Sequence, residues 1–368
     1  MQKVLINGLQ LSDHNTGVQY YTQNLYEEFL KLNEDRFNFQ LLQASSAGPC
    51  SFKRNKRIRR ILFENFSLPT YFRKNNFDLY HSPNYVLPFW SDIPSVLTIH
   101  DLLTLDYPEL CQEESVLYFK VALPLSVNKA IRIIAVSNTV KKDILEHFSI
   151  TEDKIDVIYH GINPIFKKSL DKAIPEKYRL PGKYILFVGN IEPKKNPQRL
   201  IRAFDLLKKN ADIPHKLVIV GKKGWKCQSV FDTVTRLKIT SEIIFTGYVP
   251  EEDLPVIYSM TDLFVFPSLY EGFGIPPLEA MACEVPVLVS NKGALPEITG
   301  GTCLQVDPFD MNEIARGMHQ LLTNTHLRNK SVARGKEWVR QFSWEKTAKK
   351  TLNVYEQTII RMGKTNTR

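Results

Sequence analysis

Short apolar and β-branched segments alternate with amphipathic stretches along the whole chain. This alternation favours an α/β architecture with parallel sheets, because parallel strands must be joined by crossover connections that are usually helical. Helices are predicted over residues 17–32, 138–145, 197–209 and 312–322. The strands predicted in the first half are Val4–Asn7, Asp78–His81, Ser95–His100, Arg132–Val136 and Asp156–His160.

The alternation is interrupted over residues 163–183, which are polar and punctuated by proline, as an interdomain linker would be. We therefore predict two α/β domains, residues 1–168 and 169–344, and a final helix over about residues 345–361. Ligands of open parallel sheets bind at the carboxyl ends of the strands, so we expect two sheets that face a cleft. The strands predicted in the second half are Tyr184–Gly189, Lys216–Gly221, Ile243–Gly247, Asp262–Pro267, Val285–Ser290 and Cys303–Val306.

The composition is that of a soluble globular protein, with 43% hydrophobic and 24% charged residues among 368. No apolar run approaches the roughly 18–20 residues that span a bilayer. The first residues lack the charged region, apolar core and cleavage site of a signal peptide. Five scattered cysteines without a Cys-x-x-Cys pair favour a reducing compartment. A cytoplasmic protein is therefore expected.

The net charge of +9 is unevenly distributed. Residues 1–170 hold 19 Lys and Arg against 18 Asp and Glu, which leaves +8 for residues 171–368. Within the first half, Lys53–Arg60 places six basic residues in eight positions, directly before an apolar segment. Such a run suits peripheral contact with anionic lipid on the inner face of the plasma membrane, or a solvated surface segment. Nucleic acid is disfavoured as a partner, because no recognised nucleic-acid-binding motif accompanies the charge.

The segment from Glu271 to Glu279 carries the strongest functional pattern, because it follows a predicted buried strand and opens a helix. Gly272 and Gly274 let the backbone approach a ligand closely. The Pro276-Pro277 pair suits the first helical turn, where a missing N–H costs little. A helix N-terminus with free donors between two carboxylates fits an anion that carries hydroxyl groups on both sides. A nucleotide diphosphate sugar has this chemistry.

Polar residues also follow other predicted strands. Lys195 lies in the loop after the first strand of the second half, where it would neutralise phosphate or be an exposed lysine, and it is preferred to Lys194 because it directly precedes Asn196. His100 and Asp101 close a strand of the first half, which suits a ligand cleft or a buried histidine satisfied by a carboxylate. Gly17, at a predicted helix start, would admit a substrate or phosphate, or form a simple turn.

Several common catalytic motifs are absent from the sequence. It has no Gly-x-x-x-x-Gly-Lys-Ser/Thr phosphate loop and no Gly-x-Gly-x-x-Gly dinucleotide fingerprint at the first strand. It also has no Asp-x-Asp metal clamp, His-Glu-x-x-His helix or Gly-x-Ser-x-Gly elbow. Neither a metal nor a cofactor is therefore implied, and the nucleotide sugar is expected as a substrate.

The spacing Glu271-x7-Glu279, with Gly272-Phe273-Gly274 between, resembles the signature of the retaining GT-B glycosyltransferases of family 4. Further resemblances are spread over the whole chain, which makes the joint match more specific than any one motif. They are Gly17 and residues 81–84, 98–101, 135–137, 157–163, 187–189, 195–196 and 295–297.

The resemblance implies two Rossmann-like domains that face across a cleft, with the donor held mainly by the second domain and the terminal helix packed on the first. It implies that Glu271 contacts donor-sugar hydroxyls and that Glu279 holds the nucleotide ribose. Glu271, His100 and Lys195 are the catalytic candidates, with His100 beside the transferred sugar and Lys195 on the diphosphate. Donor binding would further involve Gly189, Asn190, Gly272, Phe273 and Gly274, and the acceptor or phosphate side would involve Gly17 and Asp101.

Asn190 stands where many relatives carry Arg, and this departure resembles the mannosyltransferase branch. The resulting prediction is a retaining, metal-independent transfer of a hexose, with GDP-mannose favoured over UDP-sugars as donor. The acceptor would be a hydroxyl of a glycan or lipid-linked acceptor in surface polysaccharide synthesis. The alternatives are a GT-B-fold nucleotide-sugar epimerase and a non-catalytic binding protein.

Overall fold

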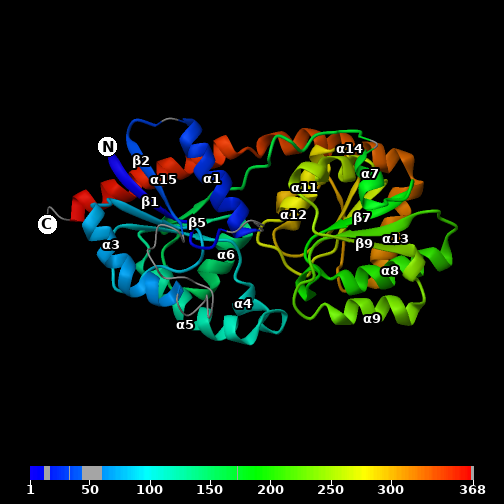
Figure 1. The fold of residues 1–368 in the computed structure, drawn as a ribbon, viewed down its shortest axis with the longest axis horizontal. Helices are drawn as coiled ribbons and strands as arrows, with labels where there is room; N and C mark the ends of the chain where they lie inside the picture. Colours follow the sequence, from blue (N-terminus) through cyan, green and yellow to red (C-terminus); the bar gives the residue numbers. More distant parts are fainter. Residues whose placement is uncertain (12–16, 33, 44–59, 172, 366–368) are drawn as a thin grey trace. The chain divides into compact units, whose positions relative to one another are not determined.

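The computed structural model divides the chain into two compact units, residues 1–161 with 342–368 and residues 162–341 (Figure 1). Among the helices that the structure describes, none is long and apolar enough to cross a membrane. The described residues are 1–11, 17–32, 34–43, 60–171 and 173–365.

A six-stranded sheet forms the centre of the first unit, in the order β2-β1-β3-β4-β5-β6. Every neighbouring pair is parallel. The interior strand β4 is buried along its whole length, as expected for a parallel strand covered on both faces. The strands are β1 (Gln2–Asn7), β2 (Phe37–Leu42), β3 (Leu79–Ser82), β4 (Ser95–Ile99), β5 (Arg132–Ala135) and β6 (Ile155–Val157).

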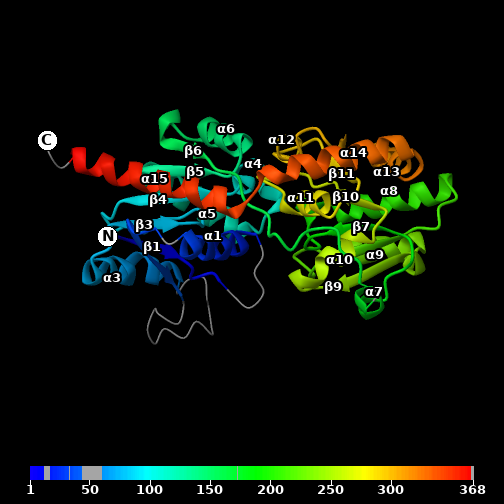
Figure 2. The same cartoon turned by 90° about the horizontal axis from the view of Figure 1, so that it is seen from above.

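Helices cover both faces of this sheet. The first helix, α1 (Val18–Leu32), and the last, α15 (Trp344–Thr365), lie side by side on one face (Figures 1 and 2). From α15, Trp344, Leu352 and Tyr355 enter the same apolar core as residues of β1 and α1. The opposite face carries α3 (Leu68–Asn75), α5 (Glu113–Lys129) and α6 (Asn138–His147), and shorter turns occur at η1 (Phe63–Ser67), α4 (Leu103–Asp106), η2 (Pro108–Leu110) and η3 (Glu152–Lys154).

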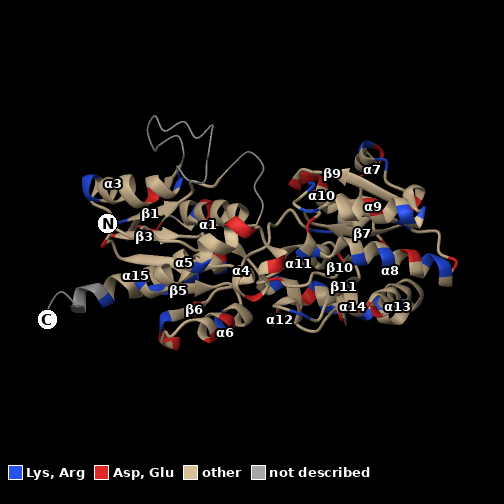
Figure 3. Ribbon diagram, turned by 90° about the horizontal axis from the view of Figure 1, so that it is seen from below, with Lys and Arg blue, Asp and Glu red and all other residues tan. Residues whose placement is uncertain are grey.

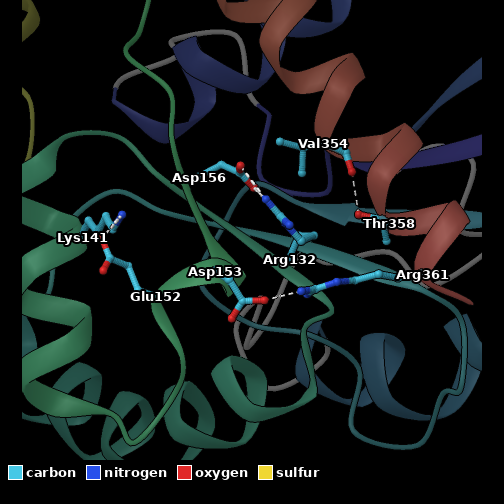
Figure 4. Close-up of polar contacts among 8 residues, drawn as sticks. All are labelled: Arg132, Lys141, Glu152, Asp153, Asp156, Val354, Thr358 and Arg361. Atoms are coloured by element: carbon cyan, nitrogen blue, oxygen red, sulfur yellow. Dashed lines mark hydrogen bonds and ion pairs between the residues drawn. The ribbon is translucent and has the colours of Figure 1, made fainter. Parts of the chain in front are cut away.

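Ion pairs surround the far end of α15 (Figure 4). Arg361 of this helix pairs with Asp153 of η3. Nearby, Arg132 of β5 donates to both carboxylate oxygens of Asp156 in β6 at 2.6–2.9 Å. The side chains of Arg361 and Asp153 are 46% and 61% exposed, and such an exposed pair contributes only about 0–1 kcal/mol. The apolar core, more than this pair, therefore holds α15 on the first unit.

The second unit contains another parallel sheet, in the order β12-β11-β10-β7-β8-β9. Its faces are covered by α8, α9 and α13 on one side and by α11 and α12 on the other (Figure 1), and α10 packs on α11. The predicted α/β architecture with two parallel sheets is confirmed. The strands are β7 (Tyr184–Val188), β8 (Lys216–Val220), β9 (Ile243–Gly247), β10 (Leu263–Phe266), β11 (Val287–Ser290) and β12 (Leu304–Val306). The helices are α7 (Ala173–Tyr178), α8 (Pro197–Asn210), α9 (Gln228–Leu237), α10 (Leu254–Ser259), α11 (Ile275–Ala282), α12 (Leu295–Ile298), α13 (Met311–Thr323) and α14 (Thr325–Trp338), with turns η4 (Pro193–Lys195), η5 (Thr240–Glu242), η6 (Glu251–Asp253) and η7 (Val339–Gln341).

Charge is placed where it supports the helices of this unit. Lys and Arg mark α8 (Figure 3), and Lys208 and Lys209 occupy its last turn. Positive charge there complements the negative end of the helix dipole. The buried face of the same helix, which includes Leu200, Ile201 and Phe204, packs inward. The helix predicted over residues 197–209 is therefore confirmed.

Two local predictions from the sequence differ from the structure. Strand β2 was not predicted, although Phe37, Phe39 and Leu41 alternate with polar residues, because charged residues precede this short edge segment. The predicted linker belongs to the second unit and contains α7. Lys177 and Tyr178 of α7 both donate to Asp253 at 2.6 Å, and these bonds hold the segment in place.

Candidate active site

Glu271 lies in the loop between β10 and α11, at the carboxyl edge of the second sheet. The loop ends at Gly274, whose φ of 96° favours glycine. A Cβ atom at Gly274 would lie 2.5 Å from Cδ2 of Leu295, so the Leu295 side chain would have to shift to admit one. Pro276 and Pro277 follow in the first turn of α11. The turn and the helix start predicted from the sequence are both present.

The backbone of Glu271 is held by the loop after β11. The N–H of Ala294 donates to the carbonyl oxygen of Glu271 at 2.8 Å. Gly293, with φ of 59°, packs against the same peptide, and a Cβ atom there would lie 2.6 Å from that carbonyl oxygen. The position of Glu271 therefore depends on a close approach that only glycine permits.

The side chain of Glu271 forms an ion pair with Lys195. The distance from Nζ of Lys195 to Oε1 of Glu271 is 2.5 Å, and the two side chains are 15% and 9% exposed. Burial raises the pKa of the Glu271 carboxyl, but attraction to Lys195 and Lys194 and the hydrogen bond from Lys195 outweigh burial. The pKa therefore lies below its ordinary value, and Glu271 is an ionised acceptor at neutral pH.

The loop that carries Lys195 is tied to the loop that carries Glu271. Asn196 adopts a left-handed conformation with φ of 61°, and its side-chain amide donates to the carbonyl oxygens of Pro267 and Pro308 at 3.0 and 2.8 Å. The N–H of Leu269 donates to the carbonyl oxygen of Lys194 at 2.8 Å. Because β7 and β10 are neighbours in the sheet, these bonds join two adjacent loops at its carboxyl edge.

Glu279 lies further along α11 and is 8% exposed. Its Oε2 accepts a hydrogen bond of 2.8 Å from the hydroxyl of Tyr258 in α10. Burial raises the pKa of Glu279 to about 8, the bond from Tyr258 opposes this rise, and the charge of Glu251 adds to it. Glu271 and Glu279 are thus distinct, since only Glu271 has a cation at its carboxylate.

The other donor-side candidates lie in the same two loops or beside them. Gly189 and Asn190 follow β7, and a Cβ atom at Gly221 would lie 2.0 Å from the carbonyl oxygen of Gly189. Gly272 and Phe273 follow Glu271, and the Phe273 side chain is buried. The structure therefore gathers the second-unit candidates at the ends of β7 and β10 and along α11.

His100 and Asp101 follow β4 in the first unit. A ring nitrogen of His100, Nε2, lies 3.0 Å from the carbonyl oxygen of Pro83. A carbonyl oxygen only accepts, so Nε2 carries a proton and donates to Pro83. Oδ1 of Asp101 accepts from the N–H of Leu103 at 3.3 Å, which gives this carboxylate a structural role at the start of α4.

Gly17 directly precedes α1 and has φ of 51°. Its carbonyl oxygen accepts from the N–H of Tyr21 at 3.0 Å, so it caps the first turn. Among the described residues, no atom lies within 4 Å of a Cβ atom built at Gly17. The positive φ therefore favours glycine at this turn.

The sequence reasoning missed three residues close to these candidates. His160 is buried, its ring centroid lies 5.3 Å from that of His100, and burial and then His100 hold its pKa well below the ordinary value. His81 is also buried, with its pKa lowered to about 3 for the same reasons. Both histidines occur at or just after predicted strands, which was the available signal. Tyr258, the third, gave no signal beyond an apolar helix.

The sequence also made predictions about metal binding and about the basic run Lys53–Arg60. Across the described ranges, no group of three or more His, Cys, Asp and Glu side chains is arranged to hold a metal ion. Of Lys53–Arg60, residues 53–59 lie outside the described residues. Arg60 lies in a helical turn, with Nε 3.9 Å from Oε1 of Glu64.

Two known families match the chain. The family described as Glycosyl transferases group 1 matches residues 171–338, and Glycosyltransferase Family 4 matches residues 17–165. The chain is 35% identical over 282 residues to O-antigen chain mannosyltransferase B of Escherichia coli, which covers 76% of this chain and 74% of that relative. The chain belongs to the family 4 glycosyltransferases.

Further similarities agree with this assignment. The glycosyltransferase is 29% identical over 369 residues to the serotype-specific mannosyltransferase WbdA of Escherichia coli. The match covers 94% of this chain but only 43% of WbdA. Sucrose-phosphate synthase from Thermosynechococcus elongatus has a similar structure, with a TM-score of 0.78 and 22% identity over 98% of this chain and 100% of that chain. The GT-B fold and the mannosyltransferase branch that the motifs implied are confirmed.

Proposed function

We propose that this glycosyltransferase transfers mannose from GDP-mannose to a hydroxyl of a glycan or lipid-linked acceptor in surface polysaccharide synthesis, with retention of configuration. The observation that carries the proposal is the buried ion pair of Lys195 and Glu271 at the edge of the second sheet. It supplies one cation for a diphosphate and one ionised acceptor for sugar hydroxyls. The names of the relatives, which are mannosyltransferases of O-antigen chains, support mannose and a polysaccharide product.

The proposed chemistry assigns no nucleophile to the protein. The bond from the anomeric carbon to the diphosphate oxygen breaks, and the acceptor oxygen attacks the same face of the sugar. The acceptor proton passes to the leaving diphosphate oxygen. Lys195 and the N-terminus of α11 stabilise the negative charge that develops there, without a metal ion. Glu271 accepts hydrogen bonds from the sugar hydroxyls and thereby orients the sugar. Its role therefore differs from that of the nucleophilic carboxylate of retaining glycosidases.

The remaining candidates are assigned by the family pattern. Glu279 accepts hydrogen bonds from the hydroxyls of the donor ribose. The donor is also contacted by Asn190 and by the backbone of Gly272, Phe273 and Gly274. In the first unit, His100 lies beside the transferred sugar by the same pattern, with its Nε2 held by the carbonyl oxygen of Pro83. Replacing His100 with Asn tests this assignment. Wild-type transfer by His100→Asn would contradict a role for His100 in sugar binding.

A turnover assay tests the function. GDP-mannose, GDP-fucose, UDP-glucose and UDP-galactose are incubated with the purified protein and a lipid-linked or oligosaccharide acceptor, with and without a chelator. We expect transfer from GDP-mannose that survives chelation, an α-anomeric product by NMR, and at least a hundredfold loss in Glu271→Ala, since a substituted transition-state contact costs on the order of 3 kcal/mol. Glu337→Ala, which removes a carboxylate 72% exposed on α14, is the matched control.

Other outcomes of this assay would contradict part of the proposal or indicate a different function. Near-normal turnover by Glu271→Ala contradicts the assigned site. A nucleotide sugar isomerised without acceptor indicates an epimerase. Absence of turnover and of nucleotide-sugar binding indicates a non-catalytic protein. An inverted product contradicts retention, and loss of activity on chelation contradicts metal independence.

Peripheral membrane association is a separate part of the proposal. It is supported by the basic run Lys53–Arg60 of the sequence, which would bind anionic headgroups from the cytoplasmic side. We expect flotation with vesicles that contain phosphatidylglycerol, and loss of flotation at high salt or after four of the six basic residues are changed to Gln. Equal recovery with neutral vesicles would contradict it.

A further inference from the structure

Tyr258 and Glu279 form a polar pair within the second unit. The hydroxyl of Tyr258 donates to Oε2 of Glu279 at 2.8 Å. Tyr258 lies in α10 and Glu279 in α11, and these helices pack against each other on one face of the sheet. The contact therefore joins two elements that are separated by a strand and by the loop that carries Glu271.

The position of the Tyr258 hydroxyl is fixed by the core. Tyr258 is fully buried, and its ring makes edge contacts with Phe264 of β10 and with Phe166, at centroid distances of 5.4 and 6.0 Å. A ring packed in this way has little freedom to move. Its hydroxyl consequently fixes the direction of one carboxylate oxygen of Glu279.

Few charges act on Glu279. Directly after its own helix lies the thiol of Cys283, whose pKa is raised to about 12 by burial and then by Glu279. From η6, Glu251 adds negative charge. On α14, the ammonium of Lys336 binds Glu284 at 2.7 Å. The Tyr258 hydroxyl is therefore the group that favours the ionised form of Glu279.

We propose that Tyr258 is a positioning residue for the nucleotide donor, and that its hydroxyl holds the Glu279 carboxylate in place to accept the two hydroxyls of the donor ribose. The inference rests on the proposed function, because it assumes that Glu279 binds the ribose. The inference adds Tyr258, which acts on the donor through Glu279 and does not itself contact the donor.

The hydrogen-bonding capacity of a carboxylate explains why this residue matters. An ionised carboxylate has about four acceptor sites, of which Tyr258 uses one, so a vicinal diol finds acceptors on both oxygens. A protonated carboxyl group has turned one of its oxygens into a donor. Since the pKa of Glu279 is about 8, donor binding near neutral pH is accompanied by loss of a proton. Affinity for the donor therefore rises as the pH rises through this value.

Tyr258→Phe tests the proposal because it removes the hydroxyl and keeps the buried ring. GDP-mannose and UDP-glucose serve as probes, since both carry a ribose diol and neither has the terminal phosphate that titrates near pH 6 in GDP and UDP. Their dissociation constants are measured by calorimetry from about pH 6 to about pH 9 for the wild type and Tyr258→Phe. Glu279→Gln shows whether Glu279 is the group whose titration changes donor affinity. Tyr184→Phe is the matched control, because Tyr184 is also buried and donates to the carbonyl oxygen of Ile257 at 2.7 Å.

We expect Tyr258→Phe to weaken donor binding about tenfold to a hundredfold near pH 7, because a hydrogen bond to a charged group is lost. The rise of affinity with pH should move to higher pH in this variant, be absent in Glu279→Gln and remain unchanged in Tyr184→Phe. In turnover, KM for the donor should rise while kcat changes little. A merely structural role for the tyrosine would not shift the pH dependence.

The possible failures are distinguishable. If the wild type binds a probe with no dependence on pH, or if Tyr258→Phe keeps the wild-type midpoint, the role of Tyr258 is overturned while the proposed function stands. A rise that persists in Glu279→Gln overturns it too, because another group then titrates. If the wild type binds neither probe at any pH, the proposed function fails and this inference fails with it.

Discussion

Nζ of Lys195 lies 2.5 Å from Oε1 of Glu271, and both side chains are largely shielded from solvent. They come from loops that follow neighbouring strands, so the pairing of β7 with β10 brings them together. Each charge offsets the cost of burying the other. A donor that places its diphosphate on Lys195 and its sugar hydroxyls on Glu271 would replace the ion pair between the two side chains. Each side chain would then contact the donor.

The first prediction is that breaking this pair destabilises the second unit. Lys195→Met leaves the Glu271 carboxylate buried without its cation, and we expect a loss of about 3–5 kcal/mol in the free energy of unfolding at neutral pH. Combining it with Glu271→Gln should restore most of that loss, because the unpaired charge is gone. Urea unfolding of the wild type, both single variants and the double variant measures the coupling.

Lys194→Met is the control for this cycle, because Lys194 acts on the Glu271 carboxyl less strongly than Lys195 does. Its effect on stability should be much smaller. Additive single-variant effects would contradict the prediction, since they would show that Lys195 and Glu271 do not interact in solution.

The second prediction concerns the close approach of Gly293 to Glu271. Gly293→Ala forces a methyl group to within 2.6 Å of the Glu271 carbonyl oxygen, so the loop must move. We expect transfer to fall at least tenfold, because a displacement of about 1 Å in a catalytic group has effects of this size or larger. Gly301→Ala separates backbone strain from steric conflict, because Gly301 has φ of 62° but no atom within 4 Å of the added methyl group.

Both alanine variants should lose some stability, since a left-handed conformation costs a non-glycine residue about 1 kcal/mol. When transfer activity is divided by the amount of folded protein, it should fall in Gly293→Ala and stay near the wild-type value in Gly301→Ala. Equal activity losses in the two variants would show that strain, and not contact with Glu271, limits the substitution.

The third prediction follows from the raised pKa of Glu279. In the unfolded chain this carboxyl ionises near its ordinary value of 4.5, whereas in the folded protein it ionises at about 8. Between these values the folded state binds more protons, so the contribution of Glu279 to stability is present at acidic pH and is lost as pH rises toward 8. Glu279→Gln does not titrate, and its stability relative to the wild type should therefore increase across this window by an amount on the order of a few kcal/mol.

Thermal or urea unfolding of the two proteins at several pH values, without ligand, gives this difference. Glu284→Gln serves as the comparison, because the pKa of Glu284 is instead lowered, mainly by its hydrogen bond from Lys336. Its stability relative to the wild type should not increase with pH. A constant difference between Glu279→Gln and the wild type would contradict the raised pKa.

Local sequence patterns were sufficient for the fold class, although not for every element, because most strands of a doubly wound unit have a signature of their own. The buried run before Glu271 and the helical stretch of residues 197–209 indicated β10 and α8 without any knowledge of tertiary contacts. The carboxyl-edge rule then placed Lys195 and Glu271 at the same edge. Contact between their side chains depended on strand order, because β7 and β10 are far apart in sequence and adjacent only in the sheet.

Partners supplied by tertiary packing could not be predicted in the same way. Tyr258 is one aromatic residue in an apolar helix, and its bond to Glu279 arises from how α10 packs on α11. His81 was part of a predicted strand, yet its partner Tyr355 lies 274 residues away. Such pairs leave no pattern in a single sequence, because any buried polar atom requires a partner but does not specify which residue supplies it.

The fourth prediction concerns His81, which makes the first unit sensitive to acid. Its Nδ1 lies 2.7 Å from the hydroxyl of Tyr355 in α15, and its Nε2 lies 2.8 Å from the hydroxyl of Thr98 in β4. Burial and then His100 lower its pKa from 6.5 to about 3, so the folded protein keeps this ring neutral. Between these values the unfolded chain binds the extra proton, and the stability contributed by His81 is lost as pH falls.

His81→Gln should therefore flatten the decline in stability between about pH 6.5 and pH 3, because an amide forms hydrogen bonds but does not titrate in this range. Tyr355→Phe provides the contrast, since it removes one hydrogen bond and leaves the histidine buried. It should lower the free energy of unfolding by about 1 kcal/mol at every pH and keep the wild-type slope. Unfolding in urea, followed by circular dichroism at several pH values, distinguishes the two. If His81→Gln retained the wild-type slope, the acid sensitivity of this unit would have to come from other buried groups, with His160 the first to test.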